Sequence, residues 1–180
     1  MLVCNVLLAL SVMTNGGLDE NARGTVKGYK SGNRYSLAVA TIHQRDTRGA
    51  PLLLSIKAAE NFRDMTAAAA RDGFYLGVSS AYRPHWKQRQ LKRKRGSLAA
   101  KPGWSTHQQG ASIDIHGTTR TIKGKKYRTI LYWWMKRSAK NYGCYNDVEE
   151  ETWHWTYVEN GPPEKRVRKK TEVTNPDDYI

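Results

Sequence analysis

Two short segments, far apart in the chain, place the strongest constraint on how it can fold. The first runs from His107 to Asp114 (HQQGASID), and the second from Glu151 to His154 (ETWH). Two imidazoles and one carboxylate can occupy three corners of a tetrahedral zinc site, and a catalytic site keeps the fourth position open. Glu151, three residues before His154, could then serve as the base for a water molecule. Both segments must therefore reach one cavity.

The composition is that of a globular protein with an anionic partner. At 180 residues, 39% of them apolar, the chain suits one domain with a proper core. The 30 Lys and Arg residues against 16 Asp and Glu give a formal net charge of +14. That charge favours nucleic acid, a membrane surface or an acidic cell-wall polymer as partner. Cys4 and Cys144 allow at most one disulfide bridge.

The first 13 residues (MLVCNVLLALSVM) carry an apolar run as long as the core of a signal peptide. They lack a basic start and a good small-residue cleavage site. No stretch of the chain approaches the roughly 20 apolar residues that span a bilayer. A buried first helix or strand and an export or tethering segment both remain open interpretations.

Periodicity predicts a helix over 55–71, which begins at Ser55 and ends at Gly73, with Phe62 and Met65 in the core. One strand is expected at 35–42 and a buried strand at 74–80. The basic helix expected at 85–95 is either a solvated surface or a docking patch for an anionic polymer.

The second half of the chain repeats this mixture of strands and helix. A strand is expected around Asp114, a hairpin or loop tip at Gly124, a helix over 129–142 and a final strand over 153–158 that presents His154. Residues 161–180 are Pro-rich and charged, which is typical of a surface tail. The predicted fold is a single α+β domain with a small antiparallel sheet flanked by helices and a zinc site at the sheet.

Three ordered blocks carry a resemblance to a known family. They are SAYRP at Ser80–Pro84, PGWSTHQQGASID at Pro102–Asp114 and ETWHW at Glu151–Trp155. Together they resemble the peptidase M15 family, the zinc D-alanyl-D-alanine carboxypeptidases and dipeptidases of the VanY/VanX type with related phage endolysins. The resemblance covers roughly residues 55 to 158, within an expected core of 51–160. Residues 1–50, with the first strand, and 161–180 lie outside it.

The resemblance implies a role for each matching residue. His107, Asp114 and His154 would bind one zinc ion, and Glu151 would be the catalytic base. Arg83 would stabilise the oxyanion or hold the substrate carboxylate, and Ser105 would line the substrate pocket. Ser112 departs from the family pattern, which often has Ala at this position, and an aromatic is common where Cys144 stands.

The function implied is hydrolysis of peptide bonds in the peptidoglycan stem at the bacterial cell wall, by a D-Ala-D-Ala carboxypeptidase or an endolysin-like peptidase. The basic surface could contact an anionic wall polymer. Two other interpretations stay open: a catalytically silent wall-binding module of the same fold, and a basic nucleic-acid-binding protein. The motifs leave open which stem-peptide bond is cut, the export route and the oligomeric state.

Overall fold

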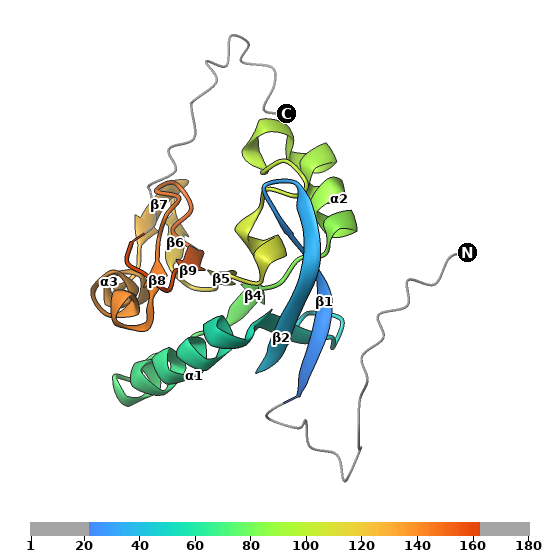
Figure 1. Ribbon diagram of the computed structural model, residues 1–180. Coiled ribbons are helices and arrows are strands. Elements are labelled where there is room, and N and C mark those ends of the chain that lie inside the picture. Colours follow the sequence, from blue (N-terminus) through green and yellow to red (C-terminus); the bar gives the residue numbers. More distant parts are fainter. Residues whose placement is uncertain (1–21, 163–180) are drawn as a thin grey trace, which may run out of the picture.

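The computed structural model describes residues 22–162, so the expectations for residues 1–13 and for nearly all of the 161–180 tail fall outside the described residues. Within 22–162 the chain forms three antiparallel sheets and three α-helices (Figure 1). The first sheet contains β1 (Arg23–Lys30), β2 (Asn33–Arg45) and β3 (Pro51–Ser55) in that order. The second has the order β4 (Val78–Ser80), β5 (Ser112–Ile115), β9 (His154–Tyr157), β8 (Cys144–Tyr145).

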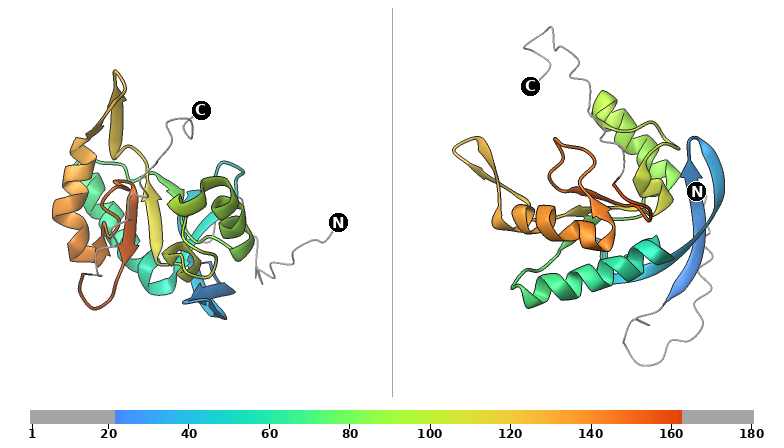
Figure 2. Two further views of the ribbon diagram at one scale, coloured as in Figure 1. Left: turned by 90° about the horizontal axis from the view of Figure 1, so that it is seen from above. Right: turned by 60° about the vertical axis from the view of Figure 1, so that its left-hand side comes forward.

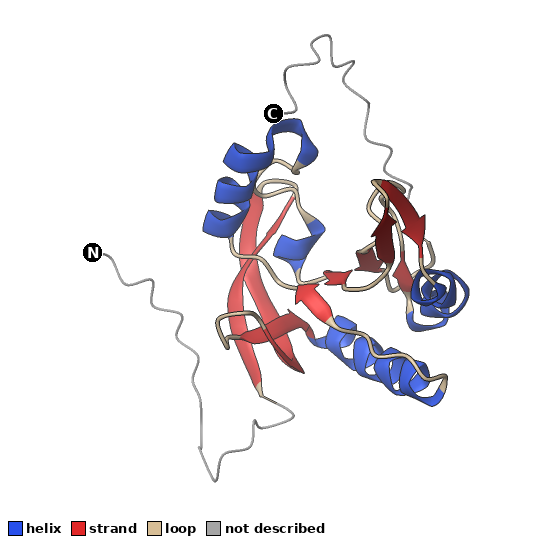
Figure 3. Ribbon diagram, turned by 180° about the vertical axis from the view of Figure 1, so that it is seen from behind, coloured by secondary structure: helices blue, strands red, loops and turns tan. Residues whose placement is uncertain are grey.

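The helices lie around these two sheets (Figure 3). Helix α2 (His85–Arg95) lies beside the first sheet, and α3 (Ile130–Ser138) beside the second, while α1 (Ile56–Arg71) runs beneath both. A two-stranded hairpin, β6 (Thr119–Ile122) with β7 (Lys125–Arg128), projects from the body (Figure 2). Three short 3₁₀ helices complete the fold: η1 (Gly96–Leu98), η2 (Thr106–Gln109) and η3 (Ala139–Tyr142).

One hydrophobic core joins the second sheet to α1 and α3. Helix α1 contributes the residues that were predicted to face inward, with Phe62 1% and Met65 0% exposed. They pack in one cluster with Ile113 and Ile115 of β5 and with Trp155 of β9. Burial of such side chains is the main stabilising term for a domain of this size. The predicted α+β class with antiparallel sheets is confirmed. In the described part of the chain, no helix is long and apolar enough to cross a membrane.

Several predicted boundaries were wrong, most of all before residue 56. The polar segment predicted to hold one strand forms both β1 and β2, and β3 was missed. In β1 all residues except Gly28 are at least partly exposed, so the strand shows no apolar alternation. The edge strand β1 forms because it pairs with β2 along its whole length, and its own residue pattern does not predict it.

The strand predicted at 74–80 is regular only over Val78–Ser80. The side-chain amide of Gln44 donates to the carbonyl of Leu76 at 2.8 Å and accepts from the amide of Val78 at 2.8 Å. The Gln44 side chain thus makes, with the segment around β4, the two backbone hydrogen bonds that a neighbouring strand would make. The helix predicted over 129–142 is α-helical only to Ser138 and continues as η3 to Tyr142.

Gly110 joins the first sheet to the segment with His107. Its φ is +64°, its carbonyl accepts from the amide of Ser55 at 2.8 Å, and a Cβ at this position would lie 2.7 Å from that amide nitrogen. Gly73, after α1, has a φ of +80°, and a Cβ there would meet nothing within 4 Å. Both glycines have a positive φ, but only Gly110 lacks room for a Cβ.

We therefore expect Gly110→Ala to lower the free energy of unfolding by about 2 to 4 kcal/mol, the sum of left-handed backbone strain and overpacking. The control, Gly73→Ala, should cost only about 1 kcal/mol, from the backbone alone. Urea denaturation of both variants measures this difference. Equal losses would show that the contact with Ser55 does not constrain Gly110.

Candidate metal centre

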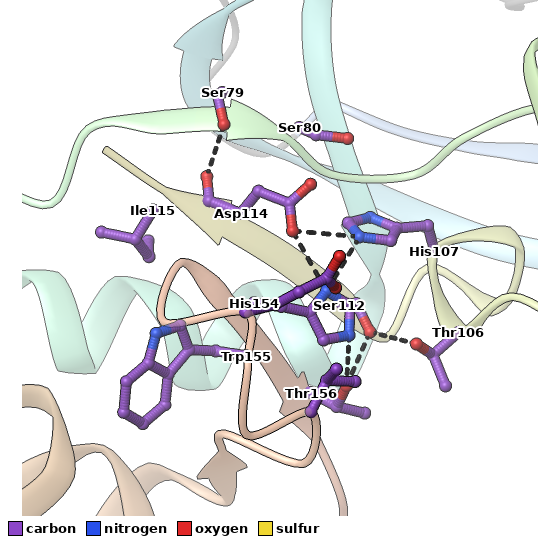
Figure 4. A network of polar contacts seen from close by, with 12 residues as sticks. Ser79, Ser80, Thr106, His107, Ser112, Asp114, Ile115, His154, Trp155 and Thr156 are labelled. Carbon is purple, nitrogen blue, oxygen red and sulfur yellow. Dashed lines mark hydrogen bonds and ion pairs between the residues drawn. The ribbon is translucent and has the colours of Figure 1, made fainter. Parts of the chain in front are cut away.

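Three chain segments bring the predicted metal ligands together (Figure 4). His107 lies in η2, Asp114 in β5, and His154 opens β9. Strands β5 and β9 are antiparallel neighbours, and Asp114 pairs directly with His154. Gly110 ends η2 in the left-handed conformation, which turns the chain from His107 into β5.

The three ligand atoms have the spacing that a tetrahedral ion requires. His107 Nε2 lies 3.2 Å from His154 Nδ1 and 3.3 Å from Asp114 Oδ1, and His154 Nδ1 lies 3.0 Å from the same oxygen. Ligands at about 2.0–2.1 Å from a tetrahedral zinc ion are about 3.3 to 3.4 Å apart. His107, Asp114 and His154 therefore form a group that can hold a metal ion, and its imidazole and carboxylate donors suit zinc.

The second ring nitrogen of His107 has a backbone partner. His107 Nδ1 lies 2.8 Å from the carbonyl oxygen of Ala81. A carbonyl can only accept, so the proton is on Nδ1 and the lone pair of Nε2 faces the other two ligands. Ala81 belongs to the SAYRP block, so this block positions the histidine of the next one.

Arg83 lies against Asp114 of the candidate metal-binding group. Its Nη2 is 3.0 Å from Ser80 Oγ and 3.4 Å from Asp114 Oδ2, and its Nη1 donates to Gln88 Oε1 at 2.9 Å. Burial lowers the pKa of Arg83, while the charges of Asp114 and Glu151 raise it. The guanidinium is thus a fixed cation beside the site, held by a buried glutamine of α2.

The protonation states suit a metal site. Burial by itself would raise the pKa of Asp114, but the interactions with His107 and His154 outweigh it and hold this pKa well below its usual range. Burial lowers the pKa of His107, against the opposing effect of Asp114. At neutral pH the site therefore holds a carboxylate and a neutral His107, the forms that bind metals.

Glu151 lies in the turn that leads into β9. Its carbonyl accepts from the amide of His154 at 2.9 Å, and its side chain is half-buried, close enough for its charge to act on Arg83. Asn146 fixes this turn, because its side-chain amide donates to the carbonyls of Glu151 and His154, both at 2.8 Å. Sequence reasoning missed Asn146, since no motif marks it.

The other predicted site residue, Ser105, immediately precedes η2 and is 5% exposed. Cys144 lies in β8 and is buried, and burial raises the pKa of its thiol to about 12. Among the described residues, Cys144 is not part of the group that could hold a metal ion. Asp147, Ser112 and Thr156 are also buried near the ligands; for Asp147 and Thr156, no pattern in the sequence had indicated a role.

Comparison with known proteins identifies the family. Residues 51–160 match the family model of VanY, D-alanyl-D-alanine carboxypeptidase. The chain belongs to this family. It is 28% identical over 139 residues to YodJ of Bacillus subtilis (strain 168), covering 66% of this chain and 50% of that protein. It is 25% identical over 133 residues to a D-alanyl-D-alanine carboxypeptidase of Enterococcus faecalis, covering 58% of this chain and 48% of that protein.

The VanY-family chain thus spans about half the length of these curated relatives. Among solved structures, it shares its fold with VanYB in complex with D-alanine-D-alanine. The TM-score is 0.53 at 21% identity, over 73% of this chain and 84% of that chain. A mutant of the vancomycin resistance D,D-pentapeptidase VanY in complex with Zn(II) gives a TM-score of 0.53 at 21% identity, over 69% of this chain and 80% of that chain.

The lowered pKa of His107 predicts a pH dependence in the metal-free protein. The unfolded chain takes up the His107 proton near pH 6.5, whereas the folded chain does so only at lower pH. The contribution of neutral His107 to the free energy of unfolding is therefore complete above pH 6.5 and is lost as the pH falls below it. The free energy of unfolding should fall with a slope of up to about 1.4 kcal/mol per pH unit. Denaturant titrations from pH 8 to pH 5, after removal of metal with a chelator, measure it.

The matched controls are His107→Asn and His116→Asn. His116 is exposed and outside the group that can hold a metal. The fall in the free energy of unfolding below pH 6.5 should become shallower in His107→Asn and should be unchanged in His116→Asn. A decline of equal slope in both variants would show that it comes from other groups.

Proposed function

We propose that this chain is a zinc peptidase that hydrolyses peptide bonds of the peptidoglycan stem, as a D-alanyl-D-alanine carboxypeptidase. The observation that carries the proposal is the convergence of His107 Nε2, Asp114 Oδ1 and His154 Nδ1 at 3.0–3.3 Å from one another, beside a fixed arginine. Membership of the VanY family and the D-alanine-D-alanine complex of a relative support the substrate class.

Three ligands would hold one zinc ion and leave one position open. When bound, zinc supplies Lewis acidity that polarises a carbonyl group and lowers the pKa of water to about 7. Asp114 brings one negative charge to the site, and two imidazoles complete the set with neutral donors. A site with this charge keeps more Lewis acidity than one built from several thiolates.

Glu151 is proposed as the general base. Its backbone carbonyl accepts from the amide of His154, and the charge of its carboxylate acts on Arg83 beside the candidate ligands. There it can take a proton from the attacking water and return that proton to the leaving amine. A catalytically silent wall-binding module would need no such carboxylate, which favours the enzyme over that alternative.

Arg83 is proposed to bind the substrate. Its planar guanidinium suits either the free carboxylate of a terminal D-alanine or the oxyanion that forms at the scissile carbonyl. A half-buried cation near the proposed ligands favours a substrate with a free C-terminal carboxylate, and hence a carboxypeptidase over an endopeptidase. Ser105, beside η2, is proposed to line the same pocket.

The proposed place of action is the bacterial cell wall, with an anionic wall polymer as a second partner. Helix α2 contains six Lys and Arg residues and no Asp or Glu. Its exposed residues include Arg89, Arg93 and Lys94. Because Gln88 of the same helix holds Arg83, polymer docked on α2 would lie next to the site.

We expect Glu151→Gln to lower the rate of D-alanine release from a stem pentapeptide by a factor of about 10² to 10⁴, the usual contribution of a general base. Zinc binding should stay intact, because Glu151 is not in the ligand group. Mass spectrometry of the digested peptide and metal analysis of the same sample measure both quantities.

The control for that experiment is Glu150→Gln, which changes the same charge one residue away, at an exposed position. It should release D-alanine like the wild type. Wild-type rates in Glu151→Gln would refute the assignment of the base. New termini other than a released D-alanine would identify an endopeptidase.

If the polymer docks on α2, wall binding should depend on the charges of this helix more than on charges elsewhere on the surface. The triple change Arg89→Gln, Arg93→Gln and Lys94→Gln should weaken binding to walls that carry teichoic acid and reduce its salt dependence. Hydrolysis of a short soluble peptide should be unchanged.

A matched control removes the same charge from the projecting hairpin, with Gln at Lys123, Lys125 and Lys126, all exposed. Wall binding should survive there. Equal losses in both triple variants would show that net charge alone is responsible. Stronger binding to duplex DNA than to walls would support the nucleic-acid alternative.

A further inference from the structure

A buried chain of polar side chains runs behind the candidate metal site. Ser112 Oγ lies 2.6 Å from Thr106 Oγ1 and 2.8 Å from Thr156 Oγ1, and Thr156 Oγ1 donates to Asp147 Oδ1 at 2.8 Å. Ser112, Thr156 and Asp147 are 0%, 4% and 3% exposed. Figure 4 shows Thr106, Ser112 and Thr156 joined by dashed lines, which continue from Thr156 to the His154 ring.

Each member of the chain comes from a segment that also carries a site residue. Thr106 directly precedes His107, and Ser112 lies two residues before Asp114 in β5. Thr156 lies two residues after His154 in β9, so their side chains share one face of the strand. Asp147 lies between β8 and the turn that precedes Glu151. The polar chain therefore links every segment that supplies a metal ligand or the proposed base.

The chain touches the metal ligands at His154. The Nε2 of this ring is 3.3 Å from Thr156 Oγ1 and 3.6 Å from Asp147 Oδ1. Since the hydroxyl proton of Thr156 is donated to Asp147, its oxygen can accept from Nε2–H. A proton on Nε2 leaves the lone pair on Nδ1, the nitrogen that faces His107 and Asp114. Without metal, Asp114 Oδ1 lies 3.0 Å from Nδ1 and competes with Thr156 by accepting from a proton on that nitrogen.

We propose that Thr156 and Asp147 are positioning residues, which fix the tautomer and the ring orientation of His154 for metal binding. A ligating histidine that donates its other N–H to an oxygen acceptor is held in orientation and is a better ligand. Here the acceptor is a hydroxyl that is itself oriented by a buried carboxylate. The inference rests on the proposed metal site, but the tautomer can be measured without metal.

The test compares Thr156→Val, which removes the hydroxyl at nearly constant volume, with Thr156→Ser, which keeps it. Ser112→Ala is the control for a purely structural role, because Ser112 belongs to the same polar chain but its hydroxyl bonds to Thr106 and Thr156 instead of the His154 ring. Asp147→Asn is a second variant, which removes the charge if Thr156→Val does not fold.

Two readouts are used at pH 8. Long-range ¹H–¹⁵N NMR of the metal-free protein shows which ring nitrogen of His154 is protonated, and chelator competition gives the zinc affinity. The share of Nε2–H should be similar in the wild type, in Thr156→Ser and in Ser112→Ala. In Thr156→Val and Asp147→Asn the balance should move toward Nδ1–H, which donates to Asp114, and zinc should bind about 10- to 100-fold more weakly.

Unchanged tautomer and affinity in Thr156→Val would overturn the inference, as would an equal loss of affinity in Ser112→Ala. The proposed function fails separately, if the wild type does not bind zinc. In that case the NMR comparison of Thr156→Val with Thr156→Ser still decides whether Thr156 sets the tautomer of His154.

Discussion

Asp114 faces His154 because β5 and β9 pair antiparallel in one register. Successive residues of a strand point to opposite faces, so a slip of one residue would move both side chains away from the site. The register is held from the other face, where Ile113, Ile115 and Trp155 lie in the hydrophobic core with α1 and α3. The same two strands thus contribute core residues from one face and candidate metal ligands from the other.

This arrangement explains how the chain keeps so many polar groups in its interior. An isolated buried charge is costly, and it is tolerated when it is paired and hydrogen-bonded. Asp114 has two imidazoles and Arg83 around it, and Arg83 in turn contacts Ser80 and Gln88. The VanY-family site is therefore prearranged by contacts that do not depend on substrate.

Sequence motifs were enough to predict the three residues that the fold brings together as a group able to hold a metal ion, because metal chemistry restricts their residue types. Helix α1 was also predicted well, since its buried residues recur at helical spacing. Strand β1 was not, because pairing with β2 determines it and its own residues show no apolar alternation. Thr156 and Asp147 could not be assigned a role from sequence, because the role of a buried hydroxyl or carboxylate depends on which groups the fold brings into contact with it.

X-ray absorption at the zinc edge of the reconstituted protein can show whether His107, Asp114 and His154 hold one zinc ion. We expect nitrogen and oxygen ligands at about 2.0–2.1 Å, with the scattering pattern of two imidazoles and no sulfur at about 2.3 Å. One imidazole should disappear in His154→Ala and none in His116→Ala. A sulfur ligand, or a His154→Ala spectrum identical to that of the wild type, would show that zinc is not held by these three residues.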